Sequence, residues 1–124
     1  IKATSKTPKV EFDADSGVLE ITGRSIPENS VDFYKPILEW LDNYEDFAKN
    51  NKETVFKFKL EYFNTSSSKC ILDIFRRLEK FHNNGVTVVI KWYYDQDDED
   101  MHESGEDFKE IMDIPVKLVE VKEA

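Results

Sequence analysis

Several short stretches of the chain alternate hydrophobic and polar residues, and each such stretch predicts a strand. The clearest is TVFKFKLEYF at residues 54–63, for which we expect one buried face and one solvated face. The residues predicted to point inward are Phe56, Phe58, Leu60 and Tyr62. Further strands are predicted within residues 10–12, 18–22, 86–94 and 114–121, and the strand at 86–94 places Trp92 in the core.

Between these strands, hydrophobic residues recur at helical spacing. A first helix is predicted from about residue 31 to residue 49, and a second follows the hydroxyl run at 65–68 and ends near HNNG at 82–85. A shorter third helix is predicted within residues 101–113, although it contains Gly105. The apolar stripe of the first helix is Phe33, Ile37, Trp40, Leu41, Tyr44 and Ala48.

The predicted order of elements is therefore β-β-α-β-α-β-α-β. Strands that alternate with helices favour parallel pairing through right-handed crossovers, while the first two strands are close enough to form an antiparallel hairpin. We expect a fold of the α/β (α+β) class, with a small mixed sheet and helices mainly on one face. The 124 residues are enough for one domain over 1–124, in which 1–6 form a flexible segment.

Charge and cysteine content narrow the possible partners. The formal net charge is −9, so the long-range field repels nucleic acid and anionic membranes. The lone Cys70 lies on the apolar stripe of the second helix, which indicates a buried free thiol in a reducing compartment. No apolar run approaches the length of a membrane span, and the first residues lack the apolar core of a signal peptide. The expected location is the cytoplasm.

The run of hydroxyl side chains between the third strand and the second helix is a candidate functional site. It comprises Thr65, Ser66, Ser67 and Ser68. One hydroxyl is enough to cap a helix, and capping alone contributes about 1 kcal/mol. Such a junction also favours negative charge, because the helix dipole and free amides point toward it. A phosphoryl group on one of these hydroxyls would be tolerated there and would change the surface that a partner meets.

An acidic stretch after the fourth strand offers a competing interpretation. Carboxylates at Asp95, Asp97, Glu99 and Glu106 echo the spacing of a calcium-binding loop, but that loop needs a glycine where this chain has Asp100. His82 and His102 have no cysteine or second histidine at zinc-ligand spacing. The chain also lacks a nucleophile elbow and a glycine-rich phosphate loop, so the residues by themselves favour a protein that is not an enzyme and needs no cofactor.

Several local patterns, in order along nearly the whole chain, resemble the SiaC family of bacterial regulatory phosphoproteins. The family typically has a Thr-Pro start, a Gly-x-Ser-x-Pro-Glu-Asn turn, an Asn-Thr-Ser-Ser motif, a Trp-Tyr-x-Asp segment and a Gly-Glu pair. The matching residues are Thr7-Pro8, Gly23 to Asn29, Asn64 to Ser67, Trp92 to Asp95, and Gly105-Glu106. The chain departs from the family at Arg24 and Ile26, where an acidic residue and an aromatic are common.

The resemblance implies a fold like the STAS domains of anti-sigma-factor antagonists. It also implies a phosphorylation switch at Thr65, with Ser66 and Ser67 as alternative acceptors. In such systems an anti-sigma-type kinase adds the phosphate and a PP2C-type phosphatase removes it. The unphosphorylated form binds and activates an effector, which in some operons is a diguanylate cyclase.

We therefore expect a non-enzymatic, phosphorylation-controlled partner-switching protein. Asn64 would shape the turn around Thr65, while Ser66 and Ser67 would cap the second helix. The residues expected to contact partners are Pro27, Glu28 and Asn29, together with Asp95, Asp97 and Asp98. Two alternatives remain: a small metal-binding or enzymatic domain that uses Asp95, Asp97 and Glu106, and a plain adaptor whose hydroxyls only cap the helix.

Overall fold

A computed structural model describes residues 1–50 and 53–122 of the chain. The elements follow the predicted order and include a five-stranded sheet. Their bounds are β1 (Lys9–Asp13), β2 (Val18–Ser25), α1 (Ser30–Ala48), β3 (Thr54–Phe63), α2 (Thr65–Asn83), β4 (Val88–Asp95), α3 (Glu99–Ile111) and β5 (Val116–Val121).

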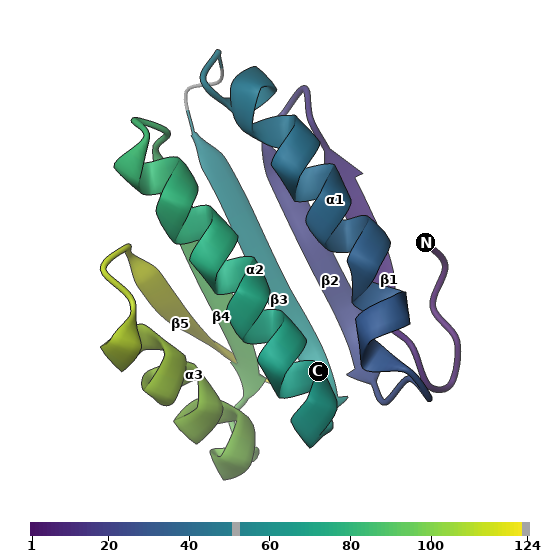
Figure 1. The fold of residues 1–124 in the computed structure, drawn as a ribbon. Coiled ribbons are helices and arrows are strands. Elements are labelled where there is room, and N and C mark those ends of the chain that lie inside the picture. Colours follow the sequence, from purple (N-terminus) through teal and green to yellow (C-terminus); the bar gives the residue numbers. More distant parts are fainter. Residues whose placement is uncertain (51–52, 123–124) are drawn as a thin grey trace.

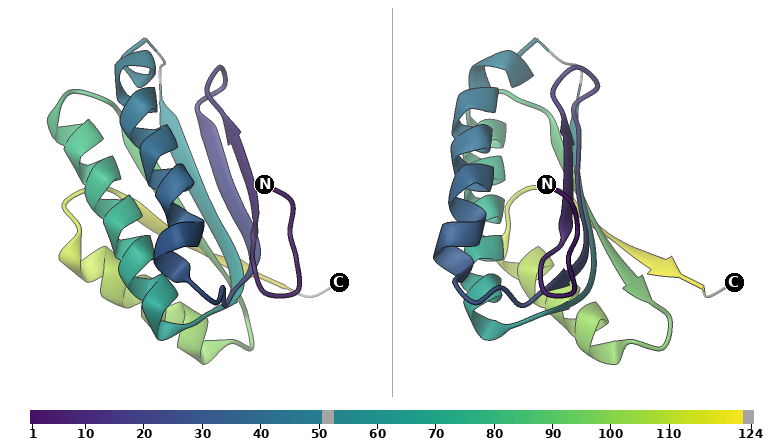
Figure 2. Two further views of the ribbon diagram at one scale, coloured as in Figure 1. Left: turned by 45° about the vertical axis from the view of Figure 1, so that its right-hand side comes forward. Right: turned by 90° about the vertical axis from the view of Figure 1, so that its right-hand side faces the viewer.

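The strands lie in the sheet in their sequence order, β1-β2-β3-β4-β5. β1 and β2 form the predicted antiparallel hairpin, and the other neighbours pair in parallel. Each crossover therefore moves to the next strand in the same direction, and crossovers of one hand then place their helices on the same side. Figures 1 and 2 show the helices in front of the sheet and its other face uncovered. The predicted fold class is confirmed.

The core lies between the helices and the covered face of the sheet and is rich in aromatic rings. Phe58 of β3 stacks on Phe75 of α2 at 5.1 Å between ring centroids, and Phe75 stacks on Phe108 of α3 at 4.7 Å. Trp92 is fully buried beside them, as predicted, and its indole N–H donates to the carbonyl of Met101 at 3.0 Å. One continuous aromatic cluster thus holds α2 and α3 on the sheet.

Gly105 explains how α3 can approach the sheet so closely. A Cβ at this position would lie 2.5 Å from Trp92 Cδ1 and 2.7 Å from Leu118 Cδ2. The predicted third helix is confirmed, and its glycine is required because no side chain fits between α3 and the indole ring. Two of the patterns that carry the family resemblance, Trp-Tyr-x-Asp and Gly-Glu, therefore meet in space.

Tyr62 was predicted to point into the core, and this prediction is wrong. The register of β2 and β3 shifts, so that Leu60 pairs with Gly23 but Tyr62 pairs with the next residue, Arg24. Glu61 is the extra residue of a bulge, and one extra residue reverses the side on which the following side chains lie. Tyr62 is consequently 52% exposed, while Phe63 packs edge-on against Trp92.

The apolar stripe of α1 is also shifted from the predicted one. Phe33 and Trp40 are only partly buried, whereas Tyr34 is fully buried. Cys70 is a buried free cysteine, as predicted. Among residues 1–50 and 53–122, no helix has the length and hydrophobicity that a membrane span requires.

Candidate functional site

The hydroxyl run lies where the N-terminal ends of two helices meet. β2 and β3 are parallel neighbours that end together, since Ser25 pairs with Phe63, and α1 and α2 begin just beyond them. Figure 1 shows both helices starting at the same end of the sheet. The Oγ atoms of Ser30 and Ser66 are 2.7 Å apart, so the two helix starts are in direct contact. Two more patterns of the resemblance, residues 23–29 and 64–67, are thereby brought together.

A buried hydrogen-bond network lies beneath this junction. The Ser67 hydroxyl donates to the backbone carbonyl of Ser25 at 3.1 Å, and the Ser25 hydroxyl donates to Ser67 Oγ at 2.9 Å. Ser25 Oγ is also 2.6 Å from the hydroxyl oxygen of Tyr34. Burial raises the pKa of Tyr34 to about 12, although its hydrogen bond with Ser25 opposes the rise. Ser67 is fully buried, and its hydrogen bonds connect α2 to β2 and α1.

The cap of α2 is Asn64 and not, as predicted, Ser66 or Ser67. The Asn64 side-chain oxygen accepts from the backbone N–H of Ser67 at 2.9 Å and from the Ser66 hydroxyl at 3.2 Å. The pairing of β3 with β2 extends to Phe63, so the cap position falls on Asn64 and the hydroxyl run lies inside the first helical turn. An asparagine in this position satisfies an otherwise free amide.

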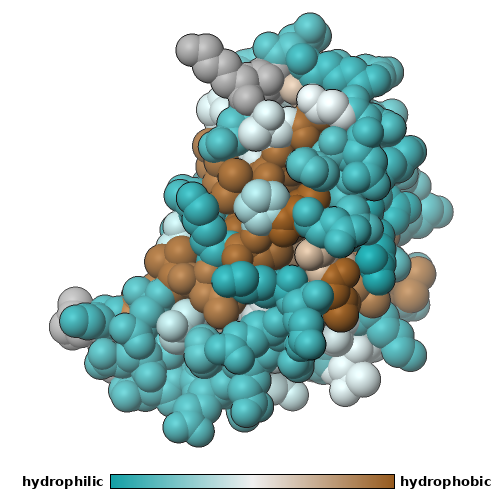
Figure 3. Space-filling model, turned by 90° about the vertical axis from the view of Figure 1, so that its left-hand side faces the viewer, coloured by the Kyte–Doolittle hydropathy of each residue, from teal (hydrophilic) through white to brown (hydrophobic). Residues whose placement is uncertain are grey.

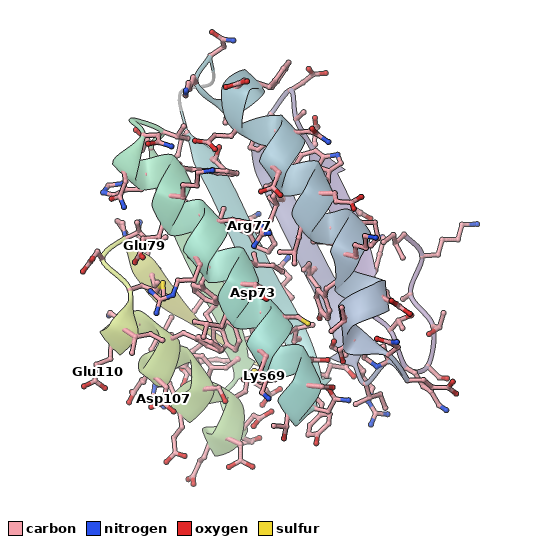
Figure 4. The ribbon with its side chains drawn as sticks, in the orientation of Figure 1. Lys69, Asp73, Arg77, Glu79, Asp107 and Glu110 are labelled. Carbon is pink, nitrogen blue, oxygen red and sulfur yellow. The ribbon has the colours of Figure 1, made fainter. Side chains whose placement is uncertain are left out.

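Thr65 is the first residue of α2, and its side chain is exposed. Within residues 1–50 and 53–122, its hydroxyl makes no hydrogen bond, whereas the hydroxyls of Ser66 and Ser67 are both engaged. Lys69 lies four residues later on the same side of the helix, also exposed, and Figure 4 shows it in the first turns of α2 followed by Asp73 and Arg77. Ser66 is exposed too, and Ser68 is half-buried, so Thr65 is distinguished by being both exposed and free of hydrogen bonds within this described part of the chain.

The three helix N-termini differ in their fixed charge. The first turn of α1 contains Asp32, and that of α3 contains Glu99 and Asp100. The first turn of α2, residues 65–68, contains no acidic side chain. Negative charge near a helix N-terminus stabilises the helix. Because the first turn of α2 has no acidic side chain, an added negative charge would stabilise α2 more than α1 or α3.

The predicted contact residues Pro27, Glu28 and Asn29 do not share one environment. Pro27 is buried, whereas Glu28 is exposed and lies 3.9 Å from Lys6 Nζ. Asn29 is exposed and caps α1, because its side-chain oxygen accepts from the backbone N–H of Asp32 at 3.1 Å. Helix entry therefore accounts for Asn29, and of these three residues only Glu28 and Asn29 are exposed.

Three acidic residues at the end of β4 and just after it shape a loop and the start of α3. The Asp95 carboxylate accepts from the backbone N–H of Asp97 at 2.9 Å, and Asp98 caps α3 by accepting from Met101 N–H at 3.0 Å. These three acidic residues line a hollow at the end of the sheet together with Lys59, Glu61, Tyr93 and Val121. They do not lie with the hydroxyl run in one pocket.

The geometry does not support the alternative interpretation, a metal site formed by Asp95, Asp97 and Glu106. Glu106 lies on α3, where its carboxylate pairs with His102 Nε2 at 3.0 Å. In the described part of the chain, which includes Asp95, Asp97 and Glu106, no three histidine, cysteine, aspartate or glutamate side chains are placed to hold a metal ion. The calcium-loop spacing in the sequence is interrupted because α3 begins at Glu99, directly after the cap at Asp98.

Sequence reasoning missed Ser25, Ser30 and Tyr34 as parts of this junction. The sequence did contain a signal for Ser25. It is a polar residue at a position of β2 where the alternation, set by Leu19 and Ile21, predicts an inward-pointing side chain. Tyr34 begins the spacing of three and four residues that the buried residues of α1 follow. That these side chains meet Ser67 depends on contacts between residues 42 positions apart.

Comparison with known proteins identifies the family. A sequence profile of the SiaC family of regulatory phosphoproteins matches residues 1–121. An uncharacterized protein of Pseudomonas aeruginosa strain UCBPP-PA14 is 33% identical over 118 residues, which cover 95% of this chain and 92% of that protein.

Two solved structures support the same assignment. Apo-SiaC from Pseudomonas aeruginosa superposes with a TM-score of 0.87 at 30% identity, over 96% of this chain and 95% of that chain. A chain in the crystal structure of the diguanylate cyclase SiaD with its activator SiaC, from the same bacterium, gives 0.89 at 31% identity over 98% of both chains. With the profile spanning every element of the fold, this chain belongs to the SiaC family of regulatory phosphoproteins.

Proposed function

We propose that this chain is a non-enzymatic, cytoplasmic switch protein whose phosphoacceptor is Thr65. A protein kinase adds the phosphate, a PP2C-type phosphatase removes it, and the unphosphorylated form binds and regulates an effector. Membership of a family of regulatory phosphoproteins supports the general role. The observation that carries the choice of residue is that Thr65 is exposed and free of hydrogen bonds, while Ser67 is buried and Ser66 is engaged.

Burial and hydrogen bonding together separate the three candidates. A kinase must reach the oxygen and displace what is bonded to it. Phosphorylation of Ser67 would place two negative charges inside the network with Ser25 and Tyr34, which burial makes costly. Phosphorylation of Ser66 would break its contacts with Ser30 and Asn64. Thr65 requires neither change.

Electrostatics favour the phosphorylated product at the same position. A phosphothreonine carries roughly −1.5 to −2 charges at neutral pH. At Thr65 these charges would lie beside the free amides of an α2 first turn that has no acidic residue, and one turn from Lys69. The modification is therefore compatible with the fold, and its main effect would be on the binding of a partner to this surface.

The effector is proposed from the comparisons. SiaC of Pseudomonas aeruginosa forms a complex with the diguanylate cyclase SiaD and is its activator, so we propose a diguanylate cyclase as the effector here. Glu28 and Asn29 belong to the neighbouring helix start and would contribute contacts beside Thr65, while buried Pro27 holds the turn. Asp95, Asp97 and Asp98 would supply further acidic contacts. Phosphate at Thr65 would displace the effector by charge and bulk.

Phosphosite mapping tests the acceptor. The chain is incubated with the kinase encoded alongside it and ATP, and phosphate is located by mass spectrometry. We expect modification of Thr65, loss of that modification in Thr65→Val, and its retention in Ser66→Ala. Phosphate on Ser67 or at a distant residue, with Thr65 unmodified, would overturn the proposal.

Effector binding tests the switch. Affinity for the diguanylate cyclase is measured for the unmodified, phosphorylated and Thr65→Val forms. We expect Thr65→Val to bind like the unmodified chain and phosphorylation to weaken binding by at least about tenfold, equivalent to 1.4 kcal/mol. Equal affinity of all three forms would favour the plain adaptor, in which these hydroxyls serve only the structure.

A further inference from the structure

The face of the sheet opposite the helices carries a row of lysines. Lys57 of β3 pairs in register with Lys91 of β4, and Lys91 pairs with Lys117 of β5. Their neighbours in sequence, such as Phe58 and Trp92, point to the helices and are buried, so the lysines point to the uncovered face. Figure 2 shows that no helix lies over this face. Three like charges therefore stand side by side on adjacent parallel strands.

The row has no counter-charge of its own. In residues 1–50 and 53–122, no carboxylate lies within 4 Å of the ammonium groups of these three lysines. Glu20 of β2 continues the row beside Lys57, but its carboxylate is 2.6 Å from Lys59, which faces the same side. Like charges on neighbouring strands are destabilising, so the isolated protein maintains this arrangement at a cost.

Partly apolar side chains border the lysines on both sides. Val55 and Val89 form the row before them, and Tyr93 and Val119 form the row after them, in which Lys59 of β3 lies over the Tyr93 ring and pairs with Glu20. The three valines and Tyr93 are half-buried by their neighbours although no helix covers them. Figure 3, which views the molecule from the edge formed by β5, shows apolar surface gathered at that edge between hydrophilic borders. The uncovered face thus has a cationic centre although the chain has a net charge of −9.

The spacing of the three lysines can be compared with the residue spacing of a bound helix or a bound extended segment. Adjacent strands are about 4.8 Å apart, so three strands extend over about 10 Å. One turn of an α-helix rises about 5.4 Å, and residues i and i+7 are about 10.5 Å apart. Acidic residues at i, i+3 or i+4, and i+7 of a helix lying across the strands would each meet one lysine. An extended segment places same-side residues nearly 7 Å apart and does not match.

We propose that the uncovered face of the sheet is a docking surface for an acidic, amphipathic α-helix of another protein, centred on Lys57, Lys91 and Lys117. The carboxylates of that helix would neutralise the lysines, and its aliphatic residues would cover the neighbouring valines and Tyr93. A second copy of this chain is a poor occupant, because it would bring lysines against lysines. Thr65 lies on the helix side of the sheet, so this docking does not depend on its phosphorylation.

Peptide binding provides the direct test. The probe is a fluorescein-labelled, capped helical peptide with glutamates at i, i+4 and i+7 and leucines beside them; a second peptide has lysines in place of the glutamates. Anisotropy is measured with the full chain at low and at high salt. We expect binding of the acidic peptide alone, weakened by salt. Lys91→Glu should weaken it by about tenfold or more.

Lys35→Glu is the matched control, because it makes the same charge change at an exposed position of α1 on the helix side. It should leave peptide affinity within about twofold of the unmodified chain, since surface charges this far apart are screened. Equal losses in the Lys35 and Lys91 variants would overturn the proposal. So would amide chemical-shift changes confined to α1 and α2 on addition of the peptide, or dimers of the chain that Lys91→Glu dissociates.

Stability of the free protein supplies an independent measurement. Lys91→Gln removes the central charge and keeps the side-chain stem, so its melting temperature should rise by about 1 to 3 °C. Its affinity for the acidic peptide should fall at the same time. A melting temperature that does not rise would mean that the lysines do not repel one another, and the proposal would lose its basis.

Discussion

The junction after β3 and the junction after β4 have the same architecture but differ in charge. Each strand is followed by a side chain that caps the next helix: Asn64 accepts from Ser67 N–H at 2.9 Å, and Asp98 accepts from Met101 N–H at 3.0 Å. The α3 cap is a carboxylate followed by Glu99 and Asp100, whereas the α2 cap is neutral and followed only by hydroxyls. The N-terminus of α3 thus has permanent negative charge, whereas the N-terminus of α2 has none and can accept a reversible one.

Burial separates neighbouring hydroxyls at the α2 junction, and this should produce the largest effect. Ser67→Asp places a carboxylate where Ser67 is fully buried among Ser25, Ser30 and Tyr34. We expect it to reduce the free energy of unfolding by at least about 3 kcal/mol in urea titrations. Thr65→Asp introduces the same carboxylate at an exposed position and should not destabilise the protein. If both variants lost a similar amount of unfolding free energy, the conclusion that Ser67 is buried and Thr65 is exposed would be contradicted.

Tyr34 makes the α2 junction sensitive to high pH. Its pKa is raised to about 12 in the folded protein, against about 10 in an unfolded chain, so the folded state holds the proton more tightly. The stabilisation is complete below pH 10 and is lost as the pH rises from about 10 to about 12, on the order of 2 kcal/mol by pH 11.5. Urea titrations of the unmodified chain and Tyr34→Phe should therefore converge over this range. If the unfolding free energies of the two proteins instead changed with pH in parallel, the raised pKa of Tyr34 in the folded protein would be contradicted.

Removing either cap should have a smaller and similar effect. Asn64→Ala and Asp98→Ala each lose one bond to a helix amide, and each should lower the free energy of unfolding by about 1 kcal/mol. The loss in Asp98→Ala should shrink at high salt, because part of it is an interaction of charge with the helix dipole. The loss in Asn64→Ala should not change with salt. The same salt response in both would show that the two junctions do not differ in electrostatics.

Exchanging the charges of the two helix starts should give the smallest effect. Thr65→Glu adds a negative charge to α2 and should stabilise the protein by about 0.3 to 1 kcal/mol at low salt. Glu99→Gln removes one from α3 and should destabilise it by a similar amount. With Asn64→Asp already present, Thr65→Glu should contribute less, because two carboxylates then compete for the same amides. Thermal unfolding at two salt concentrations measures all three differences.

The order of elements, the hairpin, the fold class and the aromatic core around Trp92 followed from hydrophobic spacing. That spacing reflects which faces must be buried, and it was reliable wherever a strand or helix kept one period throughout. The prediction for Tyr62 failed because the bulge at Glu61 interrupts the period of β3, and a bulge depends on the register with β2. The alternative metal site does not form because α3 separates Glu106 from Asp95, and sequence spacing cannot show this separation.

The sequence by itself determined that a hydroxyl run begins the second helix, that an acidic stretch follows the fourth strand, and that the chain resembles the SiaC family. Local rules of spacing and composition were sufficient for these points. Tertiary structure alone decided which hydroxyls are buried or engaged, because Ser67 is surrounded by Ser25 and Tyr34 from other elements and Ser66 contacts Ser30 of α1. It also decided that Lys57, Lys91 and Lys117 form a row, since strand register is a long-range property of the whole sheet.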